Sequence, residues 1–95
     1  MSVVIPVFNE EENIELLYTK IKQSLDNLGK GYEIIFIDDG STDKTPALLH
    51  QICEENSKVK AVVFRRNFGQ TAAISAGFDY AKGEIIVTLD ADLQN

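Results

Sequence analysis

The stretch that decides the fold is "YEIIFID" at residues 32–38, followed at once by "DGSTDKTP" at residues 39–46. The first part is almost continuously apolar, which is typical of a parallel strand buried on both faces. The second part is rich in turn-forming and helix-capping residues, and Pro46 suits a first helical turn. The sequence therefore predicts a buried strand that leads through a turn into a helix.

The same alternation extends outward from this stretch in both directions. Further strands are expected at residues 2–7, 59–64 and 84–89, and helices at residues 14–28, after Pro46, and at 71–82. Alternating helices and apolar strands predict an α/β fold, with a four-stranded parallel sheet and helices on both faces. Small residues in the last helix would let it lie close to the sheet. In such sheets, ligands bind beyond the carboxyl ends of the strands.

Composition limits the classes of function. The chain has 95 residues, 44% of them hydrophobic, and a net charge of −6, which fits one small globular domain. This acidic balance argues against a nucleic-acid partner, because such a partner needs a basic face. The single cysteine, Cys53, excludes an internal disulfide, fits a reducing compartment and is interpreted as a core thiol. No P-loop or dinucleotide-binding motif is present, and a nucleophilic triad at the single His50 is not expected.

Polar side chains follow each predicted strand where it ends, and the last set suggests a cation site. In extended chain, Asp90 and Asp92 face the same side, with Gln94 in step. Their carboxylate and amide oxygens suit Mg²⁺ or Mn²⁺. The alternative is an ordinary turn after a strand, where Asp is common. The pattern alone leaves both interpretations open.

The adjacent acids Asp38 and Asp39 also have two interpretations. Asp-Gly favours a turn, and Ser41 or Thr42 can cap the following helix. A turn and a cap use only one of the two acids, so the other is left facing the cleft. A carboxylate in that position can accept hydrogen bonds from the N–H groups of a nucleobase.

Three segments together resemble the N-terminal half of a family 2 glycosyltransferase with the GT-A fold. They are "SVVIPVFNEEENI", "IIFIDDGSTDKT" and "RRNFGQTAAISAGFDYAKGEIIVTLDADLQN". The last segment is most similar to polyprenyl-phosphate glycosyltransferases, such as dolichol-phosphate mannosyltransferases. The resemblance covers nearly the whole chain, and it implies a Rossmann-like nucleotide-sugar-binding half at residues 1–95, truncated after the D-x-D motif.

The resemblance also implies roles for individual residues. Asp90 and Asp92 correspond to the catalytic D-x-D pair, with Asp90 near the ribose and sugar. Asp92 and Gln94 correspond to ligands of Mg²⁺ or Mn²⁺. Arg65 and Asn67 match a loop that is either structural or faces the diphosphate. The nucleoside pocket corresponds to Pro6, Phe8, Glu10, Asp38 and Asp39, with Phe8 in place of the usual Tyr.

The activity implied is inverting, metal-dependent sugar transfer from a UDP- or GDP-sugar to a polyprenyl phosphate. The full-length protein is then expected in the cytoplasm, at the cytoplasmic face of the membrane. Residues 1–95 are expected to supply the donor-binding half without turnover of their own, and an open sheet edge invites association into a homo-oligomer. The alternative is a non-catalytic nucleotide-sugar-binding module.

Overall fold

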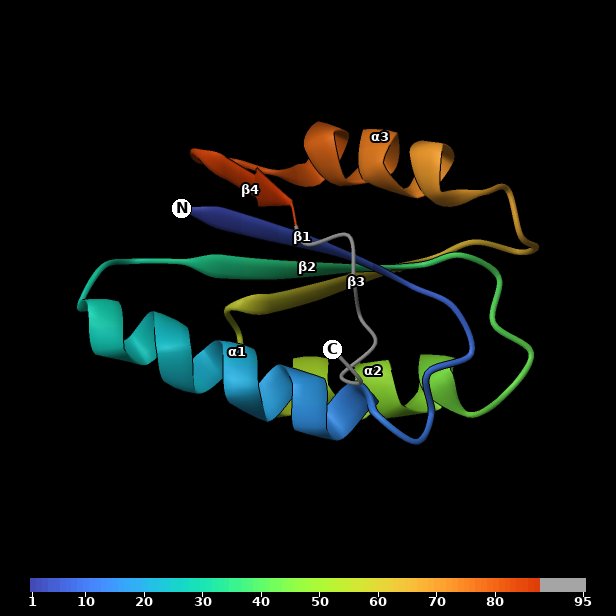
Figure 1. The fold of residues 1–95 in the computed structure, drawn as a ribbon, viewed down its shortest axis with the longest axis horizontal. Coiled ribbons are helices and arrows are strands. Elements are labelled where there is room, and N and C mark those ends of the chain that lie inside the picture. The colour runs from blue at the N-terminus through green and yellow to red at the C-terminus, as the bar shows by residue number, and fades with distance from the viewer. Residues whose placement is uncertain (88–95) are drawn as a thin grey trace.

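The structure is a computed structural model that describes residues 1–87. Strands and helices alternate along the chain (Figure 1), in the order β1 (Ser2–Val7), α1 (Ile14–Leu28), β2 (Glu33–Asp38), α2 (Thr45–Glu55), β3 (Val59–Val63), α3 (Gln70–Tyr80) and β4 (Ile85–Val87). The predicted α/β class is confirmed. The last two residues of the predicted strand 84–89 lie outside the described residues.

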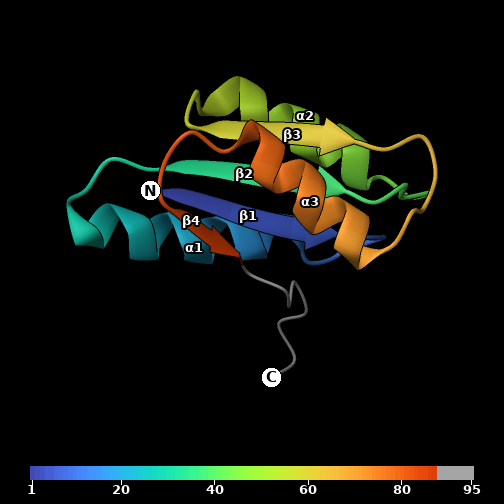
Figure 2. The same cartoon turned by 90° about the horizontal axis from the view of Figure 1, so that it is seen from above.

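All strands of the sheet run in the same direction, so their carboxyl ends lie on one side of the sheet and their amino ends on the opposite side. Its order is β3-β2-β1-β4, and every neighbouring pair is parallel. Val7 of β1 pairs with Asp38 of β2, which in turn pairs with Val63 of β3. The carboxyl ends of these three strands therefore lie side by side, as Figure 2 shows from above. We call this side, with the loops that follow the strands, the carboxyl end of the sheet, and the opposite side the amino end.

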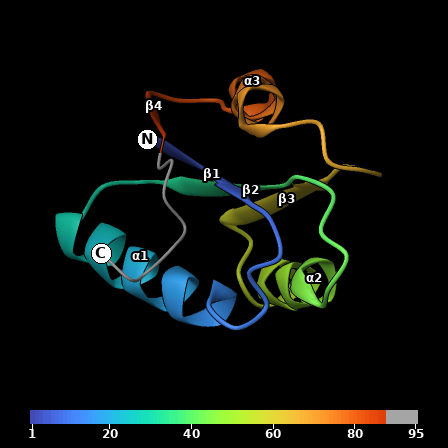
Figure 3. The same cartoon turned by 45° about the vertical axis from the view of Figure 1, so that its right-hand side comes forward.

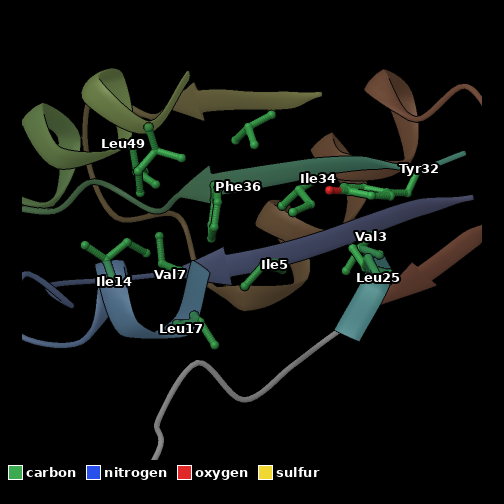
Figure 4. Packing of buried hydrophobic residues seen from close by; sticks show 12 residues of the cluster. Val3, Ile5, Val7, Ile14, Leu17, Leu25, Tyr32, Ile34, Phe36 and Leu49 are labelled. Atoms are coloured by element: carbon green, nitrogen blue, oxygen red, sulfur yellow. The ribbon is translucent and has the colours of Figure 1, made fainter. Parts of the chain in front are cut away.

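Helices cover both faces of the sheet. In Figure 3, α3 lies over one face, and α1 and α2 lie over the other. The larger hydrophobic core lies beneath α1 and α2 (Figure 4) and consists of Val3, Ile5, Val7, Ile14, Leu17, Leu25, Tyr32, Ile34, Phe36, Leu49, Ile52 and Val59. Burial of this much apolar surface is the main force that holds the two helices to the sheet. Cys53 packs against this core, as expected for a core thiol.

Helix α3 approaches the sheet closely because its inner face is made of small residues. Ala73 is fully buried, and a Cβ atom added to Gly77 would collide with Val4 Cγ1 of β1. Val4, Ala73, Ile35 and Ile37 form a second, smaller core on this face. The prediction that small residues let this helix lie close to the sheet is confirmed.

Helix α3 ends two residues before the predicted boundary at residue 82. Ala81 is already extended, with φ −72° and ψ 137°. The next two backbone N–H groups bond to the starts of other strands instead of continuing the helix. Lys82 donates to Glu33 Oε2 at 2.8 Å, and Gly83 donates to Ser2 Oγ at 3.1 Å. These contacts at the amino end of the sheet draw the chain out of the helix and toward β4.

The described helices are those of a small globular fold. Helix α1 has 15 residues and buries a stripe that includes Ile14, Leu17 and Leu25, while α2 and α3 have 11 residues each. Within residues 1–87, no helix combines the length and apolar character needed to span a membrane.

Candidate functional site

A small hollow opens at the carboxyl end of the sheet. It has a volume of about 140 Å³ and is lined by Pro6, Val7, Phe8, Asp39 and Gln70. These residues come from the end of β1, the residue after it, the residue after β2 and the first residue of α3. Whole small molecules usually occupy pockets of about 300 Å³ or more, so this hollow suits one part of a ligand, such as a single ring.

Asp39 is the charged group of the hollow, and it is only 6% exposed. Its Oδ1 accepts from the Phe68 N–H at 2.7 Å, and its Oδ2 accepts from the Gly69 N–H at 3.0 Å and from Asn67 Nδ2 at 3.1 Å. The Gly69 N–H also lies 3.3 Å from Oδ1, so each carboxylate oxygen takes two contacts from residues 67–69. Asp39 therefore fixes the loop before α3 and is at the same time one of the residues that line the hollow.

Asp38 has a different environment from its neighbour. It is fully buried, and its Oδ1 accepts from the Ser41 N–H at 2.9 Å, which closes the turn after β2. Its Oδ2 is buried and has no hydrogen-bond partner within the described part of the chain. Asp38 is not among the residues that line the hollow. The two adjacent acids thus divide between a turn and the hollow, which is the division that turn chemistry predicts.

Hydrogen bonds connect loop β1–α1 (residues 8–13) to loop β2–α2 (residues 39–44) and to Thr45, the first residue of α2. The N–H groups of Asn9, Glu10 and Glu11 donate to Ser41 Oγ at 2.8 Å, Thr45 Oγ1 at 2.9 Å and Asp43 Oδ2 at 3.2 Å, respectively. In return, the Thr42 N–H donates to Asn9 Oδ1 at 2.8 Å.

The prediction that Ser41 or Thr42 caps the following helix is wrong. Helix α2 begins at Thr45, and both residues instead bond to Asn9 in the neighbouring loop. The N-cap position is Lys44, which makes no side-chain cap bond, and it is Asp43, two residues before the helix, whose Oδ1 accepts from the Thr45 N–H at 2.8 Å. Residues 41, 43 and 45 all carry side-chain oxygens at a spacing of two, and that spacing is the signal that sequence reasoning missed.

Gly40 allows the loop after β2 to meet the loop after β3. Its φ is +75°, and a Cβ atom there would collide with the backbone of Arg66 and Asn67. Asn67 Nδ2 also donates to the Asp39 carbonyl at 3.2 Å, in addition to its bond with the carboxylate. Of the two predicted roles for Asn67, these contacts favour the structural one. The Arg66 guanidinium lies 4.8 Å from the centre of the Phe68 ring.

The predicted site residues are only partly brought together. Pro6, Phe8 and Asp39 line the hollow. Glu10 and Asp38 do not, and Glu10 Oε2 accepts from Asn13 Nδ2 at 3.3 Å. The remaining predicted residues, Asp90, Asp92 and Gln94, lie outside the described residues. Among residues 1–87, no group of three or more His, Cys, Asp or Glu side chains could hold a metal ion.

The two side chains most often used as nucleophile or base have ordinary environments here. His50 is exposed on α2, with its Nε2 2.7 Å from Glu54 Oε1. Burial raises the pKa of the Cys53 thiol, which disfavours the reactive thiolate. Neither residue lines the hollow.

Comparison with known proteins shows which family this sequence matches. The model described as "Glycosyl transferase family 2" matches residues 2–95. Two curated relatives are both named undecaprenyl-phosphate 4-deoxy-4-formamido-L-arabinose transferase. The one from Edwardsiella ictaluri is 46% identical and the one from Aeromonas hydrophila is 49% identical. The matches cover 100% of this chain but only 30% and 29% of these relatives.

Two solved structures share the fold. The crystal structure of S. aureus TarS superposes with a TM-score of 0.72 and 27% identity, over 92% of this chain and 16% of that one. The mannosyltransferase PcManGT from Pyrobaculum calidifontis, solved in complex with GDP-Man and Mn²⁺, gives a TM-score of 0.63 and 25% identity. That match covers 88% of this chain and 25% of the mannosyltransferase. The described part of the chain is thus similar to the N-terminal portion of the GT-A fold.

Proposed function

The chain belongs to glycosyl transferase family 2, and from that premise we propose that residues 1–95 form the donor-binding part of an inverting, metal-dependent glycosyltransferase. In this proposal the sheet is the four-stranded, Rossmann-like half of a GT-A fold. The donor is a UDP- or GDP-sugar, and the acceptor is a polyprenyl phosphate at the cytoplasmic face of a membrane. The names of the two relatives, which contain undecaprenyl phosphate, support the acceptor. GDP-Man in the mannosyltransferase structure supports the donor class.

The observation that carries the proposal is the hollow beside Asp39. It lies beyond the carboxyl ends of β1 and β2, where open parallel sheets bind ligands. In this proposal Phe8 and Pro6 supply apolar surface for a flat base, and the Asp39 carboxylate accepts from a base N–H in exchange for its longest contact, the 3.3 Å bond from the Gly69 N–H to Oδ1. Uracil and guanine both offer such an N–H group, so this arrangement suits UDP and GDP alike.

The proposed metal site uses residues beyond the described range. The side chains of Asp92 and Gln94 offer only oxygen and amide donors, a set that suits Mg²⁺ or Mn²⁺ and not zinc. When bound, such an ion supplies positive charge against the departing diphosphate. Asp90 is proposed to lie near the ribose and sugar. The acceptor phosphate is already anionic, so a strong general base is not required.

Thermal denaturation with added nucleotides tests this proposal. The chain is heated with UDP, GDP or CDP, each with and without Mn²⁺. A ligand that binds only the native state at 100 times its Kd adds about 2.7 kcal/mol to the free energy of unfolding. We expect UDP or GDP to raise the melting temperature, and Mn²⁺ to increase the shift. A folded sample that responds to none of the three nucleotides would contradict the proposal.

A further inference from the structure

We propose that Asn9, Ser41, Asp43 and Thr45, together called the loop clamp, position Phe8 over the hollow and thereby set the affinity for the nucleotide base. This inference rests on the proposed function, since it assigns positioning residues to the same site. None of the four residues lines the hollow. They act through the backbone next to Phe8.

The clamp captures three consecutive backbone donors. The N–H groups of residues 9, 10 and 11 all donate to side-chain oxygens of Ser41, Thr45 and Asp43, at 2.8, 2.9 and 3.2 Å. Three successive N–H groups that are bonded to one neighbouring segment fix the course of the backbone, because each bond further restricts the backbone conformations that residues 9–11 can adopt. The residue at the start of this fixed stretch is Asn9, the direct neighbour of Phe8.

Asn9 is held from both sides in a strained conformation. Its φ is +50°, and it is the only residue other than glycine with positive φ in the described part of the chain. Asparagine tolerates this region better than most residues, but it still needs support from its surroundings. The Asn9 N–H is bonded to Ser41 Oγ, and its side-chain Oδ1 accepts from the Thr42 N–H at 2.8 Å. This reciprocal pair of bonds keeps the sharp bend after Phe8.

The clamp is anchored to the core of the molecule. Thr45 is fully buried at the first position of α2. The Ser41 N–H is bonded to Asp38 Oδ1, and Asp38 is fully buried at the end of β2. Phe8, by contrast, is 44% exposed at the rim of the hollow. Packing alone therefore restrains the Phe8 ring weakly. The position of the ring depends instead on the backbone of Asn9, which the loop clamp fixes.

The test removes clamp bonds without touching the hollow. Ser41→Ala deletes the acceptor for the Asn9 N–H, and Ser41→Thr retains a hydroxyl. Asn9→Gly permits positive φ but loses the acceptor, whereas Asn9→Asp retains the acceptor oxygen. The matched control is Asn56→Ala. Asn56 also makes two side-chain hydrogen bonds, accepting from the Lys58 N–H at 2.9 Å and donating to the Tyr18 hydroxyl of α1 at 3.0 Å, but it follows α2 at the amino end of the sheet.

Binding of UDP and GDP with Mn²⁺ is measured for each variant by calorimetry. Loss of one clamp bond should weaken binding by about five- to tenfold in Ser41→Ala and Asn9→Gly. Ser41→Thr and Asn9→Asp should bind within about twofold of the wild type, on the same scale. Asn56→Ala should lower the melting temperature without changing the Kd. If Ser41→Ala binds as tightly as the wild type, the clamp does not position the base site and the inference is overturned.

A second measurement needs no nucleotide, so it separates this inference from the proposed function. The mobility of the Phe8 ring is followed by NMR relaxation with isotope-labelled phenylalanine. The ring should become more mobile in Ser41→Ala and Asn9→Gly, and stay as in the wild type in Asn56→Ala. Unchanged ring mobility in the clamp variants overturns the inference. A wild-type chain with an ordered ring that binds neither nucleotide contradicts the proposed function instead.

Discussion

The two ends of the sheet use hydrogen-bonded carboxylates in different ways. At the amino end, Glu33 Oε2 accepts from the Ser2 hydroxyl at 2.6 Å and from the Lys82 N–H at 2.8 Å, while Oε1 lies 3.3 Å from Lys60 Nζ. At the carboxyl end, Asp39 also takes three donors, but it borders a hollow. The difference indicates that Glu33 connects β1, β3 and the segment before β4, whereas Asp39 connects loops and also borders the hollow proposed to bind the nucleotide base.

Electrostatics reinforce this contrast. The Ser2 hydroxyl, the Lys82 N–H and Lys60 lower the pKa of Glu33 from 4.5 to about 2, although desolvation acts in the opposite direction. A carboxyl group with a depressed pKa stabilises the folded state at neutral pH. Glu33 therefore contributes to the stability of the folded state, and substitutions at the amino end should change stability alone, whereas substitutions at the carboxyl end should change stability and nucleotide binding.

The largest effect is expected at the glycine of the carboxyl end. Gly40→Ala forces a side chain into positive φ and into the Arg66 backbone, so the free energy of unfolding should fall by about 3 kcal/mol. Gly29 is the matched control, because its φ is also positive, at +67°, but nothing lies within 4 Å of an added Cβ. Gly29→Ala should cost only about 1 kcal/mol. Urea unfolding followed by circular dichroism measures both, and equal losses would contradict the close contact of the two loops.

A somewhat smaller effect on stability, together with a loss of nucleotide binding, is expected for a substitution of Asp39. Asp39→Asn puts an NH₂ group where N–H donors now converge, so the free energy of unfolding should fall by about 2 kcal/mol. The stabilisation by UDP or GDP should also be lost. Asp79→Asn, at an exposed acid of α3, should change stability by less than about 0.5 kcal/mol and keep the nucleotide response. A nucleotide response that survives in Asp39→Asn would remove Asp39 from the site.

The fold could be predicted from sequence where the pattern is local. The continuous apolar runs gave β1 at its observed bounds, and the apolar spacing between Ile14 and Leu28 gave α1. Burial of both faces of the sheet makes such runs necessary, so they are visible without knowledge of the tertiary structure. The end of α3 was not predictable in this way, because it depends on bonds from Lys82 and Gly83 to residues of β2 and β1.

The candidate site was predictable only in its location. Turn chemistry predicted that one of Asp38 and Asp39 serves the turn and the other faces the cleft, without saying which, and the parallel sheet indicated the end at which ligands bind. The donors to Asp39 lie 28 to 30 residues further along the chain, and the clamp bonds join residues 32 to 35 apart. Contacts at such separations depend on the register of β1, β2 and β3, which local propensity does not specify.

A moderate effect should depend on pH at the amino end. The folded-state pKa of Glu33 is depressed, so its contribution is present above about pH 4.5 and is lost as the pH falls toward 2. Glu33→Gln should lower the free energy of unfolding on the order of 2 kcal/mol at neutral pH, and less in acid. Urea unfolding across this pH range measures it. The nucleotide response should remain, and a wild-type-like pH profile in the variant would contradict the role of this carboxylate.

The smallest effect concerns the ion pair at the same end. The Lys60 side chain is 41% exposed and its Nζ lies 3.3 Å from Glu33 Oε1, so water and salt screen the attraction. Lys60→Gln should therefore cost only about 0.5 kcal/mol, and the loss should shrink in high salt. The double variant with Glu33→Gln is the control, because the Lys60 substitution should have almost no effect once its partner is neutral. An undiminished effect in that background would show that Lys60 acts through packing of its aliphatic stem. The Ser2 hydroxyl and the Lys82 N–H would then be the groups that lower the pKa of Glu33.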